Sequence, residues 1–166
     1  MSRTELIPNF CTAGNLILGV TATAALINRN FQLSVVLIIL AAVLDRADGI
    51  LARRCNATSA FGKEFDSLAD LVSFGVAPAA LSYSAMLGKW NAAGLVCFAL
   101  FTLCGAFRLA RFNIAGNPSF FQGVPITIAG SVLAVVVILA PSPAVISTSS
   151  VILSLAMVSS IRIPKI

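Results

Sequence analysis

The sequence predicts an all-α integral membrane protein built as a bundle of six transmembrane helices. Its 166 residues are 58% hydrophobic and only 10% charged, with a mean hydropathy of +0.99, whereas a soluble domain carries about 25% charged residues. No charged residue lies between Arg111 and Arg162. Uncharged apolar stretches of about 18 residues or more are candidate spans, because about 20 helical residues cross the hydrocarbon core of a bilayer.

Short polar or Gly/Pro-containing segments divide the apolar sequence into these spans. The breaks are NRN at 28–30, RCNATSA at 54–60, GKWN at 88–91, NIAGNPSF at 113–120 and APSPA at 140–144. The expected spans, with ends uncertain by about two to four residues, are Ile7–Ile27, Phe31–Arg53, Gly62–Leu87, Ala92–Phe112, Phe121–Leu139 and Ala144–Ile161. Together they leave room for one membrane domain, residues 1–166, and for no extramembrane domain.

The basic residues predict that both termini lie in the cytoplasm, because Lys and Arg favour that side of a membrane. With the N-terminus inside, only Arg29 and Lys89 lie outside, and eight basic residues lie at or near cytoplasmic ends. The net charge of +5 is explained by juxtamembrane residues next to anionic lipid, so no nucleic-acid partner is expected. Histidine is absent, which excludes a histidine base or zinc ligand and leaves proton transfer to other groups.

Four aspartates, which with Glu64 make up five of the six acidic residues, lie in one stretch where the second and third spans meet. On a helix that advances about 100° per residue, Asp45 and Asp48 lie about 60° apart. Gly49 and Ala52 fall on the same face, so the second span presents a stripe of carboxylates and small residues.

The third span carries a matching stripe, because Gly62, Asp66 and Asp70 recur at steps of four residues. A short connection makes the two spans antiparallel neighbours. We therefore expect both acidic faces to point at one small volume near the cytoplasmic edge of the membrane.

Carboxylates that converge at low dielectric repel one another unless they are protonated, paired with basic groups or bound to metal. Arg46, Arg53 and Lys63 could neutralise part of the charge. Hard divalent cations such as Mg²⁺ suit an all-oxygen site, and two metals about 3.5–4 Å apart can hold the attacking and leaving oxygens of a phosphoryl displacement. A surface charge run or a structural salt bridge explains Glu64 better than the aspartates, because ionisable groups at membrane depth are rare and mostly functional.

The spacing resembles the signature of the CDP-alcohol phosphatidyltransferase family at every defined position, Asp45-x₂-Asp48-Gly49-x₂-Ala52-Arg53-x₈-Gly62-x₃-Asp66-x₃-Asp70. The resemblance implies a six-helix membrane enzyme, often a homodimer, with a two-metal site at the cytoplasmic face. Such enzymes transfer a phosphatidyl group from CDP-diacylglycerol to an alcohol and release CMP.

Carried over residue by residue, the resemblance implies specific roles. The metal ligands, for Mg²⁺ or Mn²⁺, would be Asp45, Asp48, Asp66 and Asp70. Asp70 would also be the general base that takes the proton of the acceptor hydroxyl. The residues that accommodate the CDP-lipid would be Gly49, Ala52, Arg53 and Gly62, although glycines on these faces could equally serve close helix packing.

Flanking stretches narrow the resemblance to the phosphatidylserine synthases within that family, which implies L-serine as the acceptor. These stretches are IPNFCTAGN at 7–15, GAFRLARFN at 105–113 and FQGVPIT at 121–127. Arg108 and Arg111 could bind the serine carboxylate as bidentate guanidinium groups, or could be positive-inside anchors. Asn9 and Thr12 could bind the cytidine of the CDP-lipid, or could cap the first helix.

Three alternatives stay open from the sequence. The acceptor could be glycerol 3-phosphate, inositol or inositol phosphate instead of serine. A membrane prenyltransferase also places aspartate clusters on helices, but usually in a longer chain with two separated motifs. A cation transporter could use the aspartates as an ion path, although such proteins tend to show internal repeats, and none is visible here.

Overall fold

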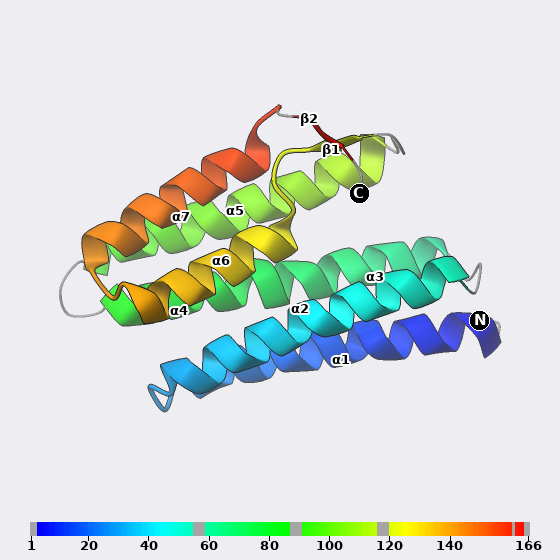
Figure 1. Ribbon diagram of the computed structural model, residues 1–166, viewed down its shortest axis with the longest axis horizontal. Coiled ribbons are helices and arrows are strands. Elements are labelled where there is room, and N and C mark those ends of the chain that lie inside the picture. Colours follow the sequence, from blue (N-terminus) through cyan, green and yellow to red (C-terminus); the bar gives the residue numbers. More distant parts are fainter. Residues whose placement is uncertain (1–2, 55–58, 87–90, 116–119, 161, 165–166) are drawn as a thin grey trace.

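Six helical rods lie side by side among the described residues, and they follow the six expected spans in order (Figure 1). The structure, a computed structural model, describes residues 3–54, 59–86, 91–115, 120–160 and 162–164, without the side chains of residues 3–8, 48, 51–54, 91, 115, 120–122 and 162–164. The rods are α1 (Arg3–Ala25), α2 (Phe31–Arg54), a third rod composed of α3 (Ala60–Asp70), η1 (Leu71–Val76) and α4 (Ala77–Met86), α5 (Asn91–Ala115), α6 (Ile126–Leu139) and α7 (Pro143–Val158). The predicted all-α class is confirmed.

The expected break at 28–30 is a tight turn between α1 and α2. Arg29 takes a left-handed backbone conformation, with φ 55°. The side-chain oxygen of Asn30 then accepts a hydrogen bond from the backbone nitrogen of Leu33 at 3.1 Å. This is an N-cap interaction, which satisfies one of the free donors at the start of a helix. The tight turn makes α1 and α2 an antiparallel pair.

The third rod is one continuous helix of 27 residues, Ala60–Met86, but its middle is a π-helix. The rod begins at Ser59, whose hydroxyl accepts a hydrogen bond from the Gly62 nitrogen at 3.0 Å. The π segment η1 starts directly after Asp70. The hydrophobic pattern did not reveal η1, and short π segments of this kind occur frequently at functional sites.

The fifth rod begins later than the sequence predicted. We expected the helix to start at Phe121, but residues 120–122 form a short strand, β1 (Phe120–Gln122), which pairs antiparallel with β2 (Arg162–Pro164). Gly123 follows with φ 76° and passes so close to the Met157 carbonyl that a side chain would overlap it. Pro125 then precedes α6, because its fixed φ suits the entry to a helix. The expected helix over 121–125 is therefore wrong, and α6 starts deeper in the bundle (Figure 1).

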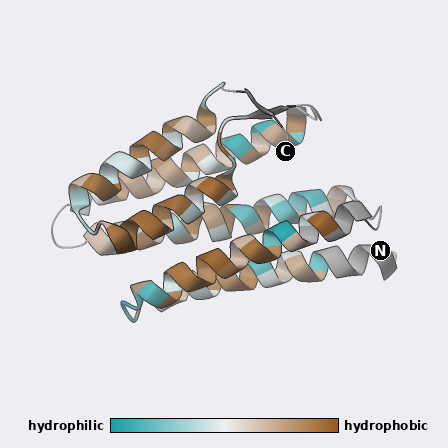
Figure 2. Ribbon diagram, in the orientation of Figure 1, coloured by the Kyte–Doolittle hydropathy of each residue, from teal (hydrophilic) through white to brown (hydrophobic). Residues whose placement is uncertain are grey.

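Hydrophobic residues make up much of the rods, most clearly of α2 and α6 (Figure 2). Large hydrophobic side chains are exposed on several rods, such as Ile17 on α1, Val43 on α2, Leu103 on α5, Ile128 on α6 and Leu155 on α7. Soluble proteins rarely expose contiguous apolar surface on this scale. By length and composition, two helices in the described part of the chain could cross a membrane, Ala60–Met86 and Ala92–Ile114.

The core lies where the third rod meets the others. Phe74, in η1, is fully buried, and the backbone of α6 approaches it directly at Gly130. A Cβ atom added to Gly130 would overlap the Phe74 carbonyl oxygen. The absence of a side chain at Gly130 therefore sets how closely α6 packs against the middle of the third rod.

We predict that Gly130→Ala lowers the free energy of unfolding by about 1–3 kcal/mol, because the Phe74 backbone cannot move aside for the methyl group. Gly49→Ala is the matched control. A Cβ atom at Gly49 meets no described atom within 4 Å, so this variant gains up to about 1 kcal/mol from helix propensity. Thermal unfolding in detergent measures both variants, and equal shifts in Tm would contradict the close contact at Gly130.

Candidate active site

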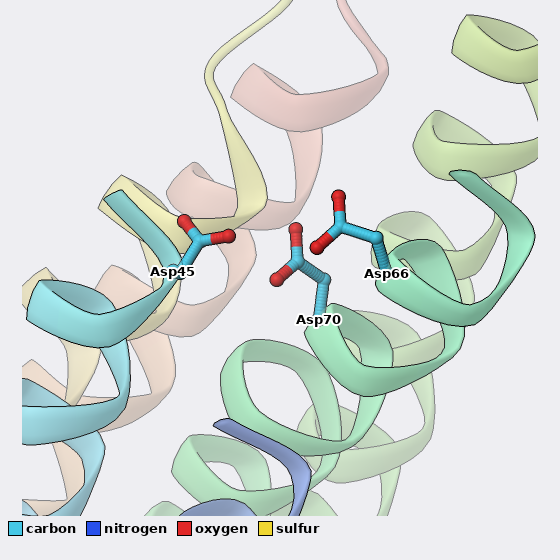
Figure 3. A group of neighbouring side chains, drawn as sticks. All are labelled: Asp45, Asp66 and Asp70. Atoms are coloured by element: carbon cyan, nitrogen blue, oxygen red, sulfur yellow. The ribbon is translucent and has the colours of Figure 1, made fainter. Parts of the chain in front are cut away.

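Three aspartates from the predicted stripes converge inside the bundle. Asp45 comes from α2, and Asp66 and Asp70 come from α3. Figure 3 shows their carboxyl groups pointing toward one another, and one ligand oxygen from each lies within 4.8 Å of the others. The antiparallel packing of α2 against the third rod therefore brings these three residues together. Asp48 lies on α2, but its side chain is outside the described part of the chain.

The cluster is strongly shielded from solvent. Asp70 is 9% exposed, and Asp45 and Asp66 are half-buried. One oxygen of Asp66, Oδ1, is buried without a hydrogen-bond partner. Since the mutual repulsion of buried carboxylates needs a counter-charge, a site of hard oxygen donors with an unpartnered oxygen fits a divalent cation such as Mg²⁺ or Mn²⁺.

Basic residues supply part of this counter-charge, but not all of the expected ones do so. Arg46 is exposed and acts on Asp45 by charge attraction. Lys63 turns away from the cluster, and its Nζ donates to the backbone oxygen of Asn113 at 2.9 Å. The Arg53 side chain is outside the described residues. Among the described side chains, the buried cation near the cluster is Arg108, on α5, which interacts electrostatically with Asp70.

The two arginines proposed for the acceptor have different surroundings. Arg108 is 7% exposed, and its Nε is buried without a hydrogen-bond partner. Arg111 donates from Nη1 to the Val158 carbonyl at 3.1 Å and from Nη2 to the Ser159 carbonyl at 3.2 Å. These carbonyls lie at the C-terminal end of α7, where a cation compensates the free acceptors of a helix. The geometry therefore favours Arg108 over Arg111 as a ligand for a substrate carboxylate.

The residues predicted to accommodate the CDP-lipid fall into three groups. Gly49 borders open space among the described atoms, whereas a Cβ atom at Gly62 would come within 3.2 Å of Asn9 Oδ1 and Ser59 Oγ. Asn9 has a buried Nδ2 without a hydrogen-bond partner, and Thr12 is buried. The side chains of two further residues lie outside the described ones, Ala52 and Arg53.

Two residues that contact the cluster were not singled out from the sequence. Asn15 Nδ2, on α1, donates to Asp70 Oδ1 at 3.2 Å. The hydroxyl of Thr127, in the first turn of α6, makes a long hydrogen bond of 3.4 Å to Asp45 Oδ2. An amide in an apolar helix was a visible signal for Asn15. Thr127 could not be found in this way, because its position depends on the late start of α6.

A second set of polar contacts holds the start of α3 against the end of α5. Asn113 Nδ2 donates to Glu64 Oε2 at 3.2 Å and to Ser67 Oγ at 3.0 Å. Its backbone oxygen accepts the bond from Lys63 described above. Lys63 and Glu64 therefore hold α3, the helix that carries Asp66, against α5. This agrees with the expectation that Glu64 has a structural role and not a role in the metal site.

Comparisons with known proteins agree on one family. The sequence model described as CDP-alcohol phosphatidyltransferase matches residues 5–161. The chain is 40% identical over 160 residues to the CDP-diacylglycerol–serine O-phosphatidyltransferase of Bacillus subtilis, covering 95% of this chain and 89% of that protein. It is 40% identical over 159 residues to the enzyme of the same name from Methanocaldococcus jannaschii, with coverages of 96% and 74%. For the Helicobacter pylori J99 enzyme of that name, identity is 42% over 137 residues, 81% of this chain and 57% of that protein.

We predict that Asp66→Asn is more stable than the unsubstituted protein without metal, and that it gains less stability when metal is added. In EDTA the variant should unfold at a higher temperature than the unsubstituted protein, because one of three repelling charges is gone. In Mn²⁺ at about a hundred times its Kd, the unsubstituted protein should gain about 2.7 kcal/mol, and the variant less than half of that. Thermal unfolding in detergent measures both effects.

Glu64→Gln is the control for this experiment, because Glu64 is an exposed carboxylate two residues from Asp66 that contacts Asn113. Its response to Mn²⁺ should equal that of the unsubstituted protein. An undiminished response in Asp66→Asn would show that the cluster is not the metal site.

Proposed function

The chain belongs to the CDP-alcohol phosphatidyltransferase family, and from this premise we propose that it transfers a phosphatidyl group from CDP-diacylglycerol to L-serine, which yields phosphatidylserine and CMP. The observation that carries the proposal is the convergence of Asp45, Asp66 and Asp70, three residues of the family signature, on one buried volume. The name shared by relatives that are about 40% identical over most of the chain supports serine as the acceptor. Family membership argues against the prenyltransferase and transporter alternatives.

The proposed metal ligands are Asp45, Asp66 and Asp70, and the signature adds Asp48. When bound, Mg²⁺ or Mn²⁺ would neutralise the charge on the pyrophosphate and on the departing CMP. The unpartnered Asp66 oxygen and the all-oxygen donor set support this assignment.

Asp70 is the proposed general base, because its carboxyl group is the most buried of the three and interacts electrostatically with Arg108. It takes the proton of the serine hydroxyl while the hydroxyl oxygen attacks the phosphorus that carries diacylglycerol. The bond from that phosphorus to the bridging oxygen breaks, and CMP leaves with the electron pair. Because both reactants are held in place, much of the acceleration comes from positioning and charge stabilisation.

Other residues have proposed roles in substrate binding. The open space at Gly49 supports clearance for the CDP-lipid beside the aspartates, and the signature adds Ala52, Arg53 and Gly62. The Asn9 side chain, with its unpartnered Nδ2, lies on α1 near Gly62 at the start of α3. Asn9 and the buried Thr12, also on α1, are proposed to contact the cytidine. Arg108 is the proposed ligand of the serine carboxylate.

The membrane arrangement is also proposed. Residues 1–166 form one domain whose six rods cross the bilayer, with both termini and the aspartates toward the cytoplasm. In Figure 1, α7 starts at the end of the bundle opposite the start of α1 and runs back toward it, as an even number of crossings requires. A homodimer, implied by the family resemblance, is proposed as the assembled form, and cross-linking in native membranes tests it.

Purified protein supplied with CDP-diacylglycerol, Mn²⁺ and one acceptor at a time tests the acceptor. We expect CMP release with L-serine to exceed that with glycerol 3-phosphate, inositol or inositol phosphate by at least a hundredfold, because the buried Arg108 matches one carboxylate. Omitting Mn²⁺ and adding EDTA should abolish release. Preferential turnover of a phosphorylated acceptor would contradict the assignment to serine but would leave the family chemistry intact.

Arg108→Lys should raise the KM for serine at least tenfold while the KM for CDP-diacylglycerol changes by less than threefold, because Lys cannot form the bidentate pair. Arg111→Lys is the comparison. It should lower Tm by weakening the contact with the α7 carbonyls and leave the KM for serine within twofold. A larger effect on serine from Arg111 than from Arg108 would reverse the assignment.

A further inference from the structure

Asn15 connects α1 to the proposed general base. Its side chain is fully buried, and its Nδ2 donates to Asp70 Oδ1 at 3.2 Å. Its backbone oxygen accepts a hydrogen bond from the Ser73 hydroxyl, in η1, at 2.9 Å. Asp70 and Ser73 are three residues apart, so both face the same side of the third rod and meet the same residue of α1.

The packing around Asn15 leaves its side chain little freedom. One turn further along α1, a Cβ atom at Gly19 would overlap Ser73, so the α1 backbone lies directly against η1. Asn15 is therefore held at two points. Ser73 binds its backbone oxygen, and Asp70 binds its side-chain amide.

Helix packing alone does not account for an amide at this position. The Asn15 Oδ1 atom is buried without a hydrogen-bond partner, and leaving a buried acceptor unsatisfied is unfavourable. An apolar side chain of similar size, such as leucine, would fill the space without that cost. Among the described residues, the Asn15 side chain forms a hydrogen bond with Asp70 alone, which makes that bond the reason for an amide here.

We propose that Asn15 is a positioning residue for phosphatidyl transfer: its amide fixes the rotation of the Asp70 carboxyl group by holding Oδ1, and so sets the direction in which the other oxygen faces the acceptor hydroxyl. The inference rests on the proposed function, in which Asp70 is the base. An amide suits this task because its NH₂ group can only donate, whereas a carboxylate at the same place would repel Asp70.

The experiment compares Asn15→Leu and Asn15→Ala with Ser73→Ala in the serine-dependent release of CMP. Each rate is divided by the number of sites that bind CDP-diacylglycerol in the presence of Mn²⁺, so that misfolded protein does not count. Ser73→Ala is the matched control, because it removes the other hydrogen bond between Asn15 and the third rod without touching Asp70. We expect both Asn15 variants to lose at least tenfold in kcat per site, with the KM for each substrate within threefold. We expect Ser73→Ala to lower Tm and to keep kcat per site within twofold.

Three outcomes would overturn the inference. The first is a kcat per site within twofold of the unsubstituted protein in both Asn15 variants. The second is an equal loss in Ser73→Ala, which would mean that packing of α1 against η1 is sufficient. The third is a change confined to KM, which would make Asn15 a substrate-binding residue.

Asp70→Asn, measured in the same series, separates this inference from the proposed function. It should lose turnover and keep Mn²⁺-dependent binding of CDP-diacylglycerol. Normal turnover in Asp70→Asn would reject Asp70 as the base, whatever Asn15 does. Loss of turnover in Asp70→Asn together with normal turnover in Asn15→Leu would reject only the positioning role.

Discussion

Mutual repulsion among Asp45, Asp66 and Asp70 is the constraint on which this structure depends. Their ligand oxygens lie within 4.8 Å of one another in the interior of an apolar bundle. Burial of this much like charge is unfavourable unless the carboxylates are protonated, paired with basic groups or bound to a cation. A bound divalent ion relieves the repulsion and at the same time provides the charge that a pyrophosphate substrate needs. The feature that is most costly for the fold is thus the one that supports the proposed reaction.

The surrounding rods hold this cluster by close backbone contacts and by few polar ones. The middle of the third rod widens into η1 directly after Asp70, and α1 and α6 approach it at Gly19 and Gly130. Such contacts suit a membrane protein, in which helices associate through tight packing because lipid provides little hydrophobic driving force between them. Two of the polar contacts between rods reach the cluster directly, since Asn15 binds Asp70 and Thr127 binds Asp45.

The two arginines of α5 show how position within one helix separates two roles. Arg111 lies in the last part of α5, and its guanidinium binds the carbonyls of Val158 and Ser159 at the end of α7. Arg108, about one turn earlier, is buried near Asp70 with an unpartnered nitrogen. A guanidinium in such a place has few possible partners besides the aspartates and a substrate anion. Because the two arginines lie about one turn apart, Arg111 can anchor the end of α7 while Arg108 remains available to bind a substrate anion.

The sequence by itself determined the number and order of the helices, and it identified Asp45, Asp66 and Asp70 as a group. Long uncharged stretches mark helices that cross lipid, and a step of three or four residues places side chains on one face, so both properties are local and can be read along the chain. The tertiary structure alone decided which residues support the group. Asn15 lies 55 positions from Asp70 and Thr127 lies 82 positions from Asp45, and no local pattern relates residues so far apart. The late start of α6 and the capping role of Arg111 were hidden for the same reason, since both depend on contacts with the end of α7 that exist only once the rods have packed.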